Sequence, residues 1–190
     1  MGLSISDPKD SNLVRRDQSS YMAVDILEFD LGGESYAMDI GIAREIVEML
    51  PITPIPRAPP HVTGLLNLRG EITTIINLHH LLGIIPVKKN EDQVIMVLIP
   101  DVLENTSVGV IVDEVHSVLT IDEKYVDMNI RGVNEGLIEY IKGIIKLGED
   151  DSIKRENSSN GDEREKRLII WIDVRKILIE TIEQKKNLDK

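Results

Sequence analysis

Short stretches of alternating apolar and polar residues dominate the first part of the chain. In residues 24–31, the apolar side chains of Leu27, Phe29 and Leu31 alternate with Glu28 and Asp30, so one face of a strand would be apolar and the other polar. A pair of glycines follows, and residues 35–40 alternate again. This pattern predicts two antiparallel strands joined by a tight turn, with Glu28 and Asp30 on the solvent side.

Residues 64–78 predict a second hairpin. Leucines lead into its turn and β-branched residues, mostly isoleucine, lead out of it, as in a half-buried strand. Gly70 allows the tight reversal of the chain, and Arg69 lies beside it at the tip. An arginine next to a turn glycine is most often an ordinary solvated residue, so a binding role for Arg69 depends on the two arguments given below.

The remaining chain contains further short apolar segments and two helical ones. Strands or strand-like segments are predicted at residues 42–50, 94–99, 108–112, 115–119, 140–147 and 168–172. Residues 79–83 have the pattern of one helical turn, and residues 174–184 place apolar side chains at helical spacing, which predicts a C-terminal amphipathic helix. Five prolines within residues 51–60 predict an extended connector.

The two halves of the chain share a pattern that indicates an internal duplication. Residues 42–50 align with 111–119, residues 64–68 with 143–147, and residues 76–82 with 172–178. Each copy would hold about five short strands, enough for a small closed barrel. The second copy keeps the turn glycine at Gly148 but has no arginine beside it. The fold can therefore be built without Arg69, which favours a role of this residue in recognition.

These patterns predict a mainly β protein made of two packed barrels with a C-terminal helix. The predicted boundaries are a flexible tail at residues 1–20 and a single domain at residues 21–190, divided into barrels at about residues 22–86 and 94–180. Residues 148–167 are mostly charged and are predicted to form a mobile loop within the second barrel.

Composition excludes several classes of function. The net charge is −11 and no dense stripe of Lys and Arg occurs, which argues against a barrel-type nucleic-acid binder and against adsorption to an anionic membrane. The absence of cysteine excludes disulfides, thiolate catalysis and cysteine-based metal sites. No apolar stretch approaches the roughly 20 residues that span a bilayer. With no secretory signal pattern at the N-terminus, a cytoplasmic location is expected.

Catalytic and cofactor-binding patterns are also missing from the sequence. There is no nucleophile elbow and no phosphate-binding loop with its lysine. The adjacent pair His79 and His80 invites a metal hypothesis, but neighbouring side chains diverge and no third ligand follows at suitable spacing, so a partly exposed helical turn is the preferred interpretation. His61 and His116 are isolated. We expect no cofactor, and an enzyme with an unrecognised carboxylate site remains the alternative.

Three blocks of sequence resemble the signature of CheW-type chemotaxis coupling proteins. They are the alternating segment of residues 27–40 followed by Glu45 and Ile46, the motif Gly-x-x-Asn-Leu-Arg-Gly at residues 64–70, and Val-Gly-x-Ile-Val-Asp-x-Val at residues 108–115. The blocks occur in order, and the resemblance covers about residues 22–180. It is the second argument for a functional role of Arg69.

The resemblance implies a fold of two five-stranded SH3-like barrels and a non-catalytic adaptor. Such proteins bridge the cytoplasmic tips of chemoreceptors to the regulatory domain of the histidine kinase CheA, with receptor helices in the groove between the barrels and the kinase on a barrel end. They need no cofactor and are mostly monomeric alone. The two-domain CheV type is not expected, because no response-regulator segment follows residue 190.

The resemblance also implies which residues bind partners. In the family, the arginine of the Asn-Leu-Arg-Gly motif pairs with the glutamate that Glu45 matches here, and position 43 is often a larger aliphatic residue than alanine. The candidate partner-binding residues are Arg69, Glu45, Asn67, Gly70, Ala43 and Gly64. We expect Arg69 and Glu45 to approach within ion-pair distance, on adjacent strands of the first barrel.

Overall fold

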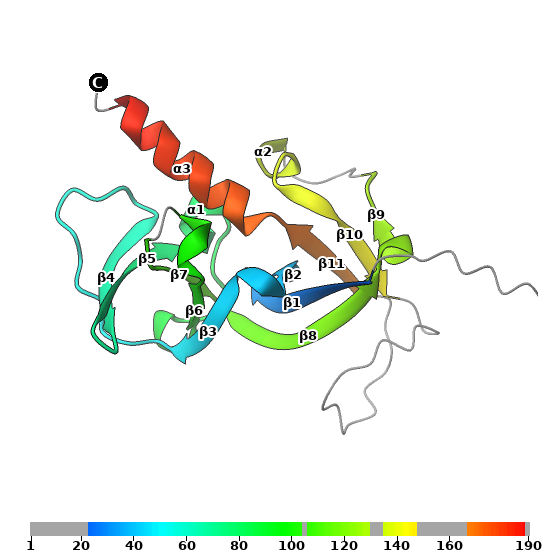
Figure 1. Ribbon diagram of the computed structural model, residues 1–190, viewed down its shortest axis with the longest axis horizontal. Coiled ribbons are helices and arrows are strands. Elements are labelled where there is room, and N and C mark those ends of the chain that lie inside the picture. The colour runs from blue at the N-terminus through cyan, green and yellow to red at the C-terminus, as the bar shows by residue number, and fades with distance from the viewer. Residues whose placement is uncertain (1–22, 104–105, 130–134, 148–166, 189–190) are drawn as a thin grey trace, which may run out of the picture.

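Two β-sheets and a long C-terminal helix form the computed structural model, which describes residues 23–103, 106–129, 135–147 and 167–188 (Figure 1). The strands are β1 (Ala23–Leu31), β2 (Glu34–Asp39), β3 (Ala43–Glu48), β4 (Val62–Leu68), β5 (Glu71–Asn77), β6 (Val94–Leu98), β7 (Val108–Val112), β8 (Glu114–Asp122), β9 (Val126–Asp127), β10 (Ile141–Leu147) and β11 (Arg167–Ile172). The α-helices are α1 (Leu78–Leu82), α2 (Glu135–Ile138) and α3 (Val174–Leu188). Short 3-10 helices are η1 (Ile40–Ile42), η2 (Asn90–Asp92), η3 (Pro100–Val102) and η4 (Glu123–Tyr125). The predicted hairpins, the helical turn and the C-terminal helix are all confirmed.

The two sheets repeat the same strand order. Barrel A is the six-stranded sheet β8-β1-β2-β11-β10-β9, and barrel B is the five-stranded sheet β3-β6-β7-β5-β4. Their single parallel pairs, β2 with β11 and β5 with β7, occur at the same place in the order, and all other pairs are antiparallel. This correspondence agrees with the duplication that the sequence indicates.

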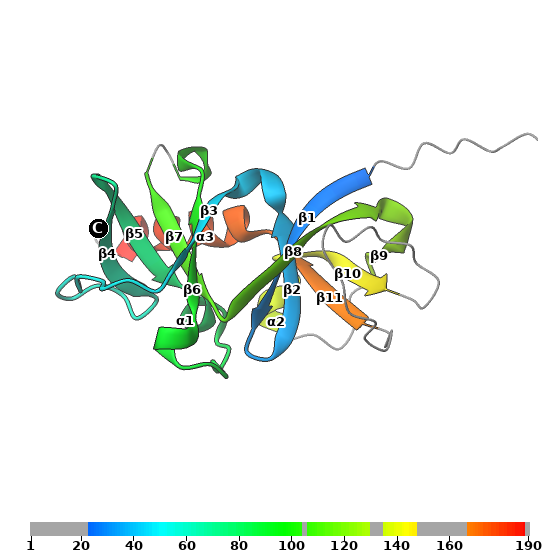
Figure 2. The ribbon, with the colours of Figure 1, turned by 90° about the horizontal axis from the view of Figure 1, so that it is seen from below.

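The strand pairing corrects the predicted boundaries of the two barrels. Residues 22–86 and 94–180 are the two sequence copies, but neither copy forms one barrel. The β1–β2 hairpin of the first copy lies in barrel A, and the β6–β7 hairpin of the second copy lies in barrel B (Figure 2). The copies have thus exchanged hairpins. Alternation along a strand reveals which side is buried but not which strand lies beside it, so the sequence pattern could not show this.

Two predicted segments lie outside the described residues. They are the tail at residues 1–20 and the loop at residues 148–167, apart from Arg167, which begins β11.

The largest apolar cluster lies between the two barrels. It joins side chains of β1 and β2 from barrel A to those of β6 and β7 from barrel B, and Val174, Ile177 and Leu178 of α3 are buried in it. The spacing of these three residues gives α3 one apolar face. Asp173 caps the helix, because its Oδ1 accepts a hydrogen bond from the Lys176 backbone N–H at 2.9 Å. Among the described residues, no helix is long and apolar enough to cross a membrane.

Strand β1 is buried on both sides, which corrects the prediction that Glu28 faces solvent. The odd residues Leu27 and Phe29 belong to the cluster between the barrels. Glu28 is only 1% exposed, and it lies opposite Ala37, which belongs to the core of barrel A. Since β1 lies between β8 and β2 and also packs against barrel B, neither of its faces reaches solvent at this point.

Candidate functional site

The β4–β5 hairpin turns in two residues, Arg69 and Gly70. Both have positive φ angles, 52° and 91°, which is the pattern of a type I′ turn. Glycine adopts this conformation freely, whereas a residue with a Cβ atom is uncommon there. Asn67 stabilises the turn, because its Oδ1 accepts a hydrogen bond from the Gly70 backbone N–H at 2.9 Å. Arg69 is therefore held at the tip in a conformation that arginine rarely adopts.

Four charged residues connect this hairpin to β3, and we call them the seam network: Arg44, Glu45, Arg69 and Glu71. Arg69 Nη2 lies 3.1 Å from Glu45 Oε2, which confirms the predicted approach of these two residues. Arg44 Nη1 lies 2.8 Å from Glu71 Oε2, and Arg44 Nε lies 3.9 Å from Glu45 Oε1. Positive and negative side chains thus alternate across the gap between β3 and the hairpin.

The seam network corrects one part of the prediction. Glu45 and Arg69 were expected on adjacent strands, but β3 and β4 lie at opposite ends of the order of barrel B. The curvature of the sheet brings its two ends together, and the ion pairs cross the seam where the barrel closes. The network therefore links two elements that share no ladder of backbone hydrogen bonds.

Arg44 and Glu71, the second ion pair of the seam network, shift each other's pKa. The hydrogen bond from Arg44 holds the pKa of the Glu71 carboxyl below its usual value. The same hydrogen bond raises the pKa of the Arg44 guanidinium. Arg69 is 84% exposed, so its own pair with Glu45 is strongly screened by water. The seam network fixes a pattern of charge on the surface more than it stabilises the fold.

The other predicted site residues have separate positions. A Cβ atom on Gly64 would lie 2.2 Å from the Thr53 carbonyl oxygen, so glycine is required for the connector to pack against β4. Thr53 and Leu65 exchange two backbone hydrogen bonds at this crossing, of 2.9 and 2.8 Å. Ala43 begins β3 and packs, half-buried, against the cluster between the barrels. The structure therefore brings Arg69, Glu45, Asn67 and Gly70 together and leaves Gly64 and Ala43 outside the seam network.

Sequence reasoning missed Arg44 and Glu71. A signal was present, because each of them is next to a residue already singled out: Arg44 precedes Glu45, and Glu71 follows Gly70. Opposite charges beside two residues that are expected to meet indicate a second ion pair.

Truncation of Arg69 should have little effect on stability. Arg69→Ala keeps a Cβ atom at the positive φ angle, so the backbone cost of the turn is unchanged. Only an exposed ion pair is lost, which contributes about 0–1 kcal/mol. The melting temperature measured by circular dichroism should stay within a few degrees of the wild type. A fall of many degrees would identify Arg69 as a folding residue. Lys146→Ala, which removes an exposed cation of barrel A, serves as the control.

The histidines occupy positions that the sequence did not predict. His79 is completely buried rather than partly exposed, while His80 is exposed, so the two adjacent side chains do diverge. His116 is not isolated, because its Nε2 lies 2.9 Å from Asp30 Oδ2. Within the part of the chain that the structure describes, no group of three or more His, Asp or Glu side chains could hold a metal ion.

Comparison with known proteins identifies the family of this chain. The model of the CheW-like domain family matches residues 25–181. A chemotaxis protein CheW of Treponema pallidum is 32% identical over 124 residues, which cover 65% of this chain and 73% of that protein. A chemotaxis protein CheW of Thermotoga maritima is 30% identical over 156 residues, covering 82% of this chain and 88% of that protein.

A solved structure agrees with these relatives. The crystal structure of the scaffolding protein TtCheW from Thermoanaerobacter tengcongensis superposes with a TM-score of 0.63 at 29% identity, covering 82% of this chain and 88% of that one. The two sheets described above have the architecture of two SH3-like barrels that this family shares. With its family model, its relatives and its fold in agreement, this chain belongs to the CheW family of chemotaxis coupling adaptors.

Proposed function

We propose that this protein links the cytoplasmic tips of chemoreceptors to the regulatory domain of a CheA-type histidine kinase, without catalysing a reaction itself. The observation that carries the proposal is the pair of Arg69 and Glu45 at 3.1 Å, which is the pair that the family resemblance implies for partner binding. None of the relatives favours the alternative of a carboxylate enzyme on a barrel scaffold.

Two packed barrels offer an adaptor two separate surfaces. In this proposal the receptor helices occupy the groove between the barrels, and the kinase regulatory domain docks on a barrel end. We expect each contact to be of the transient kind that buries under about 1,200 Å² in total, with a dissociation constant in the micromolar range. The strength of signalling comes from many such contacts in an array, which the protein joins through protein contacts on the cytoplasmic side of the membrane.

Within this proposal the predicted site residues have different roles. Arg69 and Glu45 present charge to the partner, and Asn67 and Gly70 fix the turn from which Arg69 projects. Ala43 and Gly64 contribute to this part of the protein through packing, Ala43 against the cluster between the barrels and Gly64 against the connector at Thr53. Substitutions of the first pair should therefore affect binding, whereas substitutions of Gly64 should affect stability first.

The test is whether both partners bind the full chain at once. Analytical ultracentrifugation of the protein with the kinase regulatory domain and a receptor cytoplasmic fragment should yield a species that contains all three. Each partner alone should form a binary complex. If the kinase domain and the receptor fragment displace each other, the two surfaces overlap and the bridging function is wrong. If neither binds, the adaptor proposal itself is wrong.

A further inference from the structure

Asp113 lies where the chain passes from one barrel to the other. Strand β7 of barrel B ends at Val112 and β8 of barrel A begins at Glu114, so Asp113 alone makes the connection. Its side chain is completely buried, although it carries an ionisable group. A buried carboxylate is costly unless it is paired and hydrogen-bonded, so its contacts define what this residue does.

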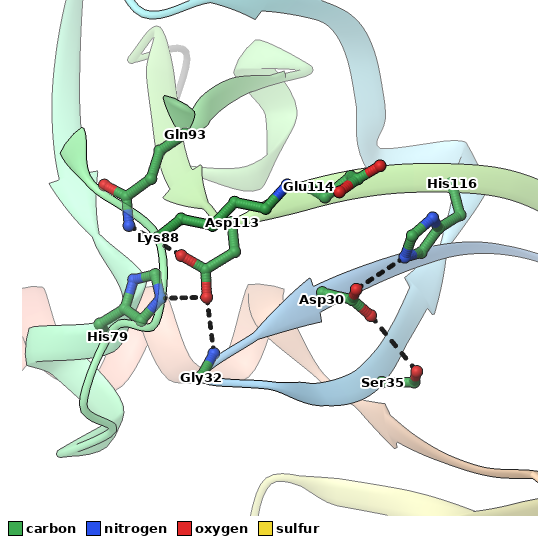
Figure 3. A network of polar contacts seen from close by, with 9 residues as sticks. All are labelled: Asp30, Gly32, Ser35, His79, Lys88, Gln93, Asp113, Glu114 and His116. Atoms are coloured by element: carbon green, nitrogen blue, oxygen red, sulfur yellow. Dashed lines mark hydrogen bonds and ion pairs between the residues drawn. The ribbon is translucent and has the colours of Figure 1, made fainter. Parts of the chain in front are cut away.

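Three segments of the chain contact this one carboxylate. The Gly32 backbone N–H donates to Asp113 Oδ2 at 2.7 Å, and Gln93 Nε2 donates to Oδ1 at 2.9 Å. His79 Nε2 lies 3.0 Å from Oδ2 (Figure 3). The Asp113 backbone N–H also donates to the Asp30 carbonyl oxygen at 3.1 Å.

These partners come from both barrels. Gly32 forms the β1–β2 turn of barrel A, whereas His79 lies in α1 and Gln93 precedes β6, both on the side of barrel B. Further ion pairs surround the carboxylate: Lys88 with Glu114, and His116 with Asp30 at 2.9 Å. The carboxylate therefore ties the turn of barrel A to α1 and to the residue that precedes β6 in barrel B.

The charge of Asp113 is maintained by its contacts. Burial alone would raise the pKa of its carboxyl, but the hydrogen bonds from Gln93 and Gly32, together with the His79 imidazole beside it, outweigh burial and hold the pKa below its usual value. The carboxylate is thus ionised at neutral pH and can accept several hydrogen bonds at once. A neutral amide at this position could not accept all of them.

Directional contacts of this kind complement the apolar cluster between the barrels. Apolar burial is non-directional, so the cluster prevents the barrels from separating but tolerates small rotations of one against the other. Buried hydrogen bonds have narrow limits of distance and angle, so they permit one arrangement only. We infer that Asp113 is a positioning residue that fixes the orientation of the two barrels, and thereby the relative placement of the two binding surfaces. The last step rests on the proposed adaptor function.

The orientation can be tested by residual dipolar couplings of the full-length protein. In the wild type, couplings from both barrels should fit one alignment tensor. In Asp113→Asn each barrel should still fit a tensor of its own, but the two tensors should differ in size or direction. A single shared tensor in this variant would overturn the inference. So would the loss of dispersed signals from both barrels, because Asp113 would then be a residue of general folding.

A milder variant and a matched control complete this test. Gln93→Met removes one of the three contacts without changing the charge. The alignment tensors of the two barrels should then differ from each other in the same way as in Asp113→Asn, but by a smaller amount. If Asp113→Asn does not fold, an unchanged shared tensor in Gln93→Met overturns the inference. Asp25→Asn changes an exposed carboxylate of barrel A and should leave the shared tensor intact.

The functional consequence is measured separately. Asp113→Asn should bind the kinase regulatory domain, which docks on one barrel end, with wild-type affinity. Binding of the receptor fragment, which lies in the groove between the barrels, should weaken, and receptor-dependent kinase activation should fall by about fivefold or more. Unchanged activation would show that barrel orientation does not matter for coupling. If the wild-type protein does not couple at all, the proposed function fails, and the dipolar couplings alone still decide whether Asp113 fixes the barrels.

Discussion

Arg69→Glu should disrupt partner binding while the protein stays folded. The substitution keeps a Cβ atom at the positive φ angle of the turn and reverses the charge at the tip on a shorter side chain. It replaces the guanidinium that lies 3.1 Å from Glu45 with a carboxylate on the same side of the turn, and this carboxylate is two residues away from Glu71 in the sequence. Like charges at close range repel, and a partner selected by an arginine meets the wrong sign.

The expected result is a hierarchy of affinities. For the partner that contacts the seam network, Arg69→Ala should weaken binding modestly and Arg69→Glu by at least about tenfold. Isothermal titration calorimetry with the kinase regulatory domain and with the receptor fragment, each alone, identifies which partner that is. Lys146→Glu reverses an exposed charge on barrel A and is the matched control. Unchanged affinity of Arg69→Glu for both partners would exclude the seam network from binding.

Arg167→Leu should strongly destabilise the protein. Arg167 forms an ion pair with Glu28, whose side chain is almost completely buried. Arg167 begins β11 opposite Leu147, which packs on the core of barrel A, so the pair lies at the edge of this core. Among the described residues, Arg167 is the only cationic partner recorded for Glu28. Removing it leaves a buried carboxylate without a counter-charge.

The size of the effect follows from the burial of each partner. Breaking a buried pair by removing one member costs about 3–5 kcal/mol, and we expect about 3 kcal/mol because Arg167 itself is partly exposed. Urea unfolding measures the change. In the double variant Glu28→Leu/Arg167→Leu the unpaired charge is also removed, so most of the lost stability should return. A single variant as stable as the wild type would show that Glu28 is neutral or solvated in the folded protein.

The sequence identified the elements of this fold but not their partners. Alternation located β1 and β2, the hairpin of β4 and β5, and the face of α3 that is buried. It could not show that the copies exchange hairpins, because a strand carries no local signal of its neighbour. It also assigned Glu28 to the solvent side, since alternation assumes one exposed face, and β1 has none.

Only part of the candidate site could be predicted, because the sequence also carries no local signal of which polar residues meet in the fold. Resemblance to the family located the pair of Arg69 and Glu45, and the structure added Arg44 and Glu71 across the same seam. The contact between His79 and Asp113 was missed because the two residues belong to separate motifs and meet only where the barrels join. Long-range contacts between single polar residues leave no periodic pattern along a sequence.

The most direct test of the adaptor function is the autophosphorylation rate of a CheA-type kinase in the presence of receptor cytoplasmic fragments. The rate is measured as the concentration of this protein is increased from zero. We expect it to rise with added protein, to saturate, and to need both the receptor fragment and the protein. A rate that is the same with and without the protein would contradict the assignment of this chain as the coupling component.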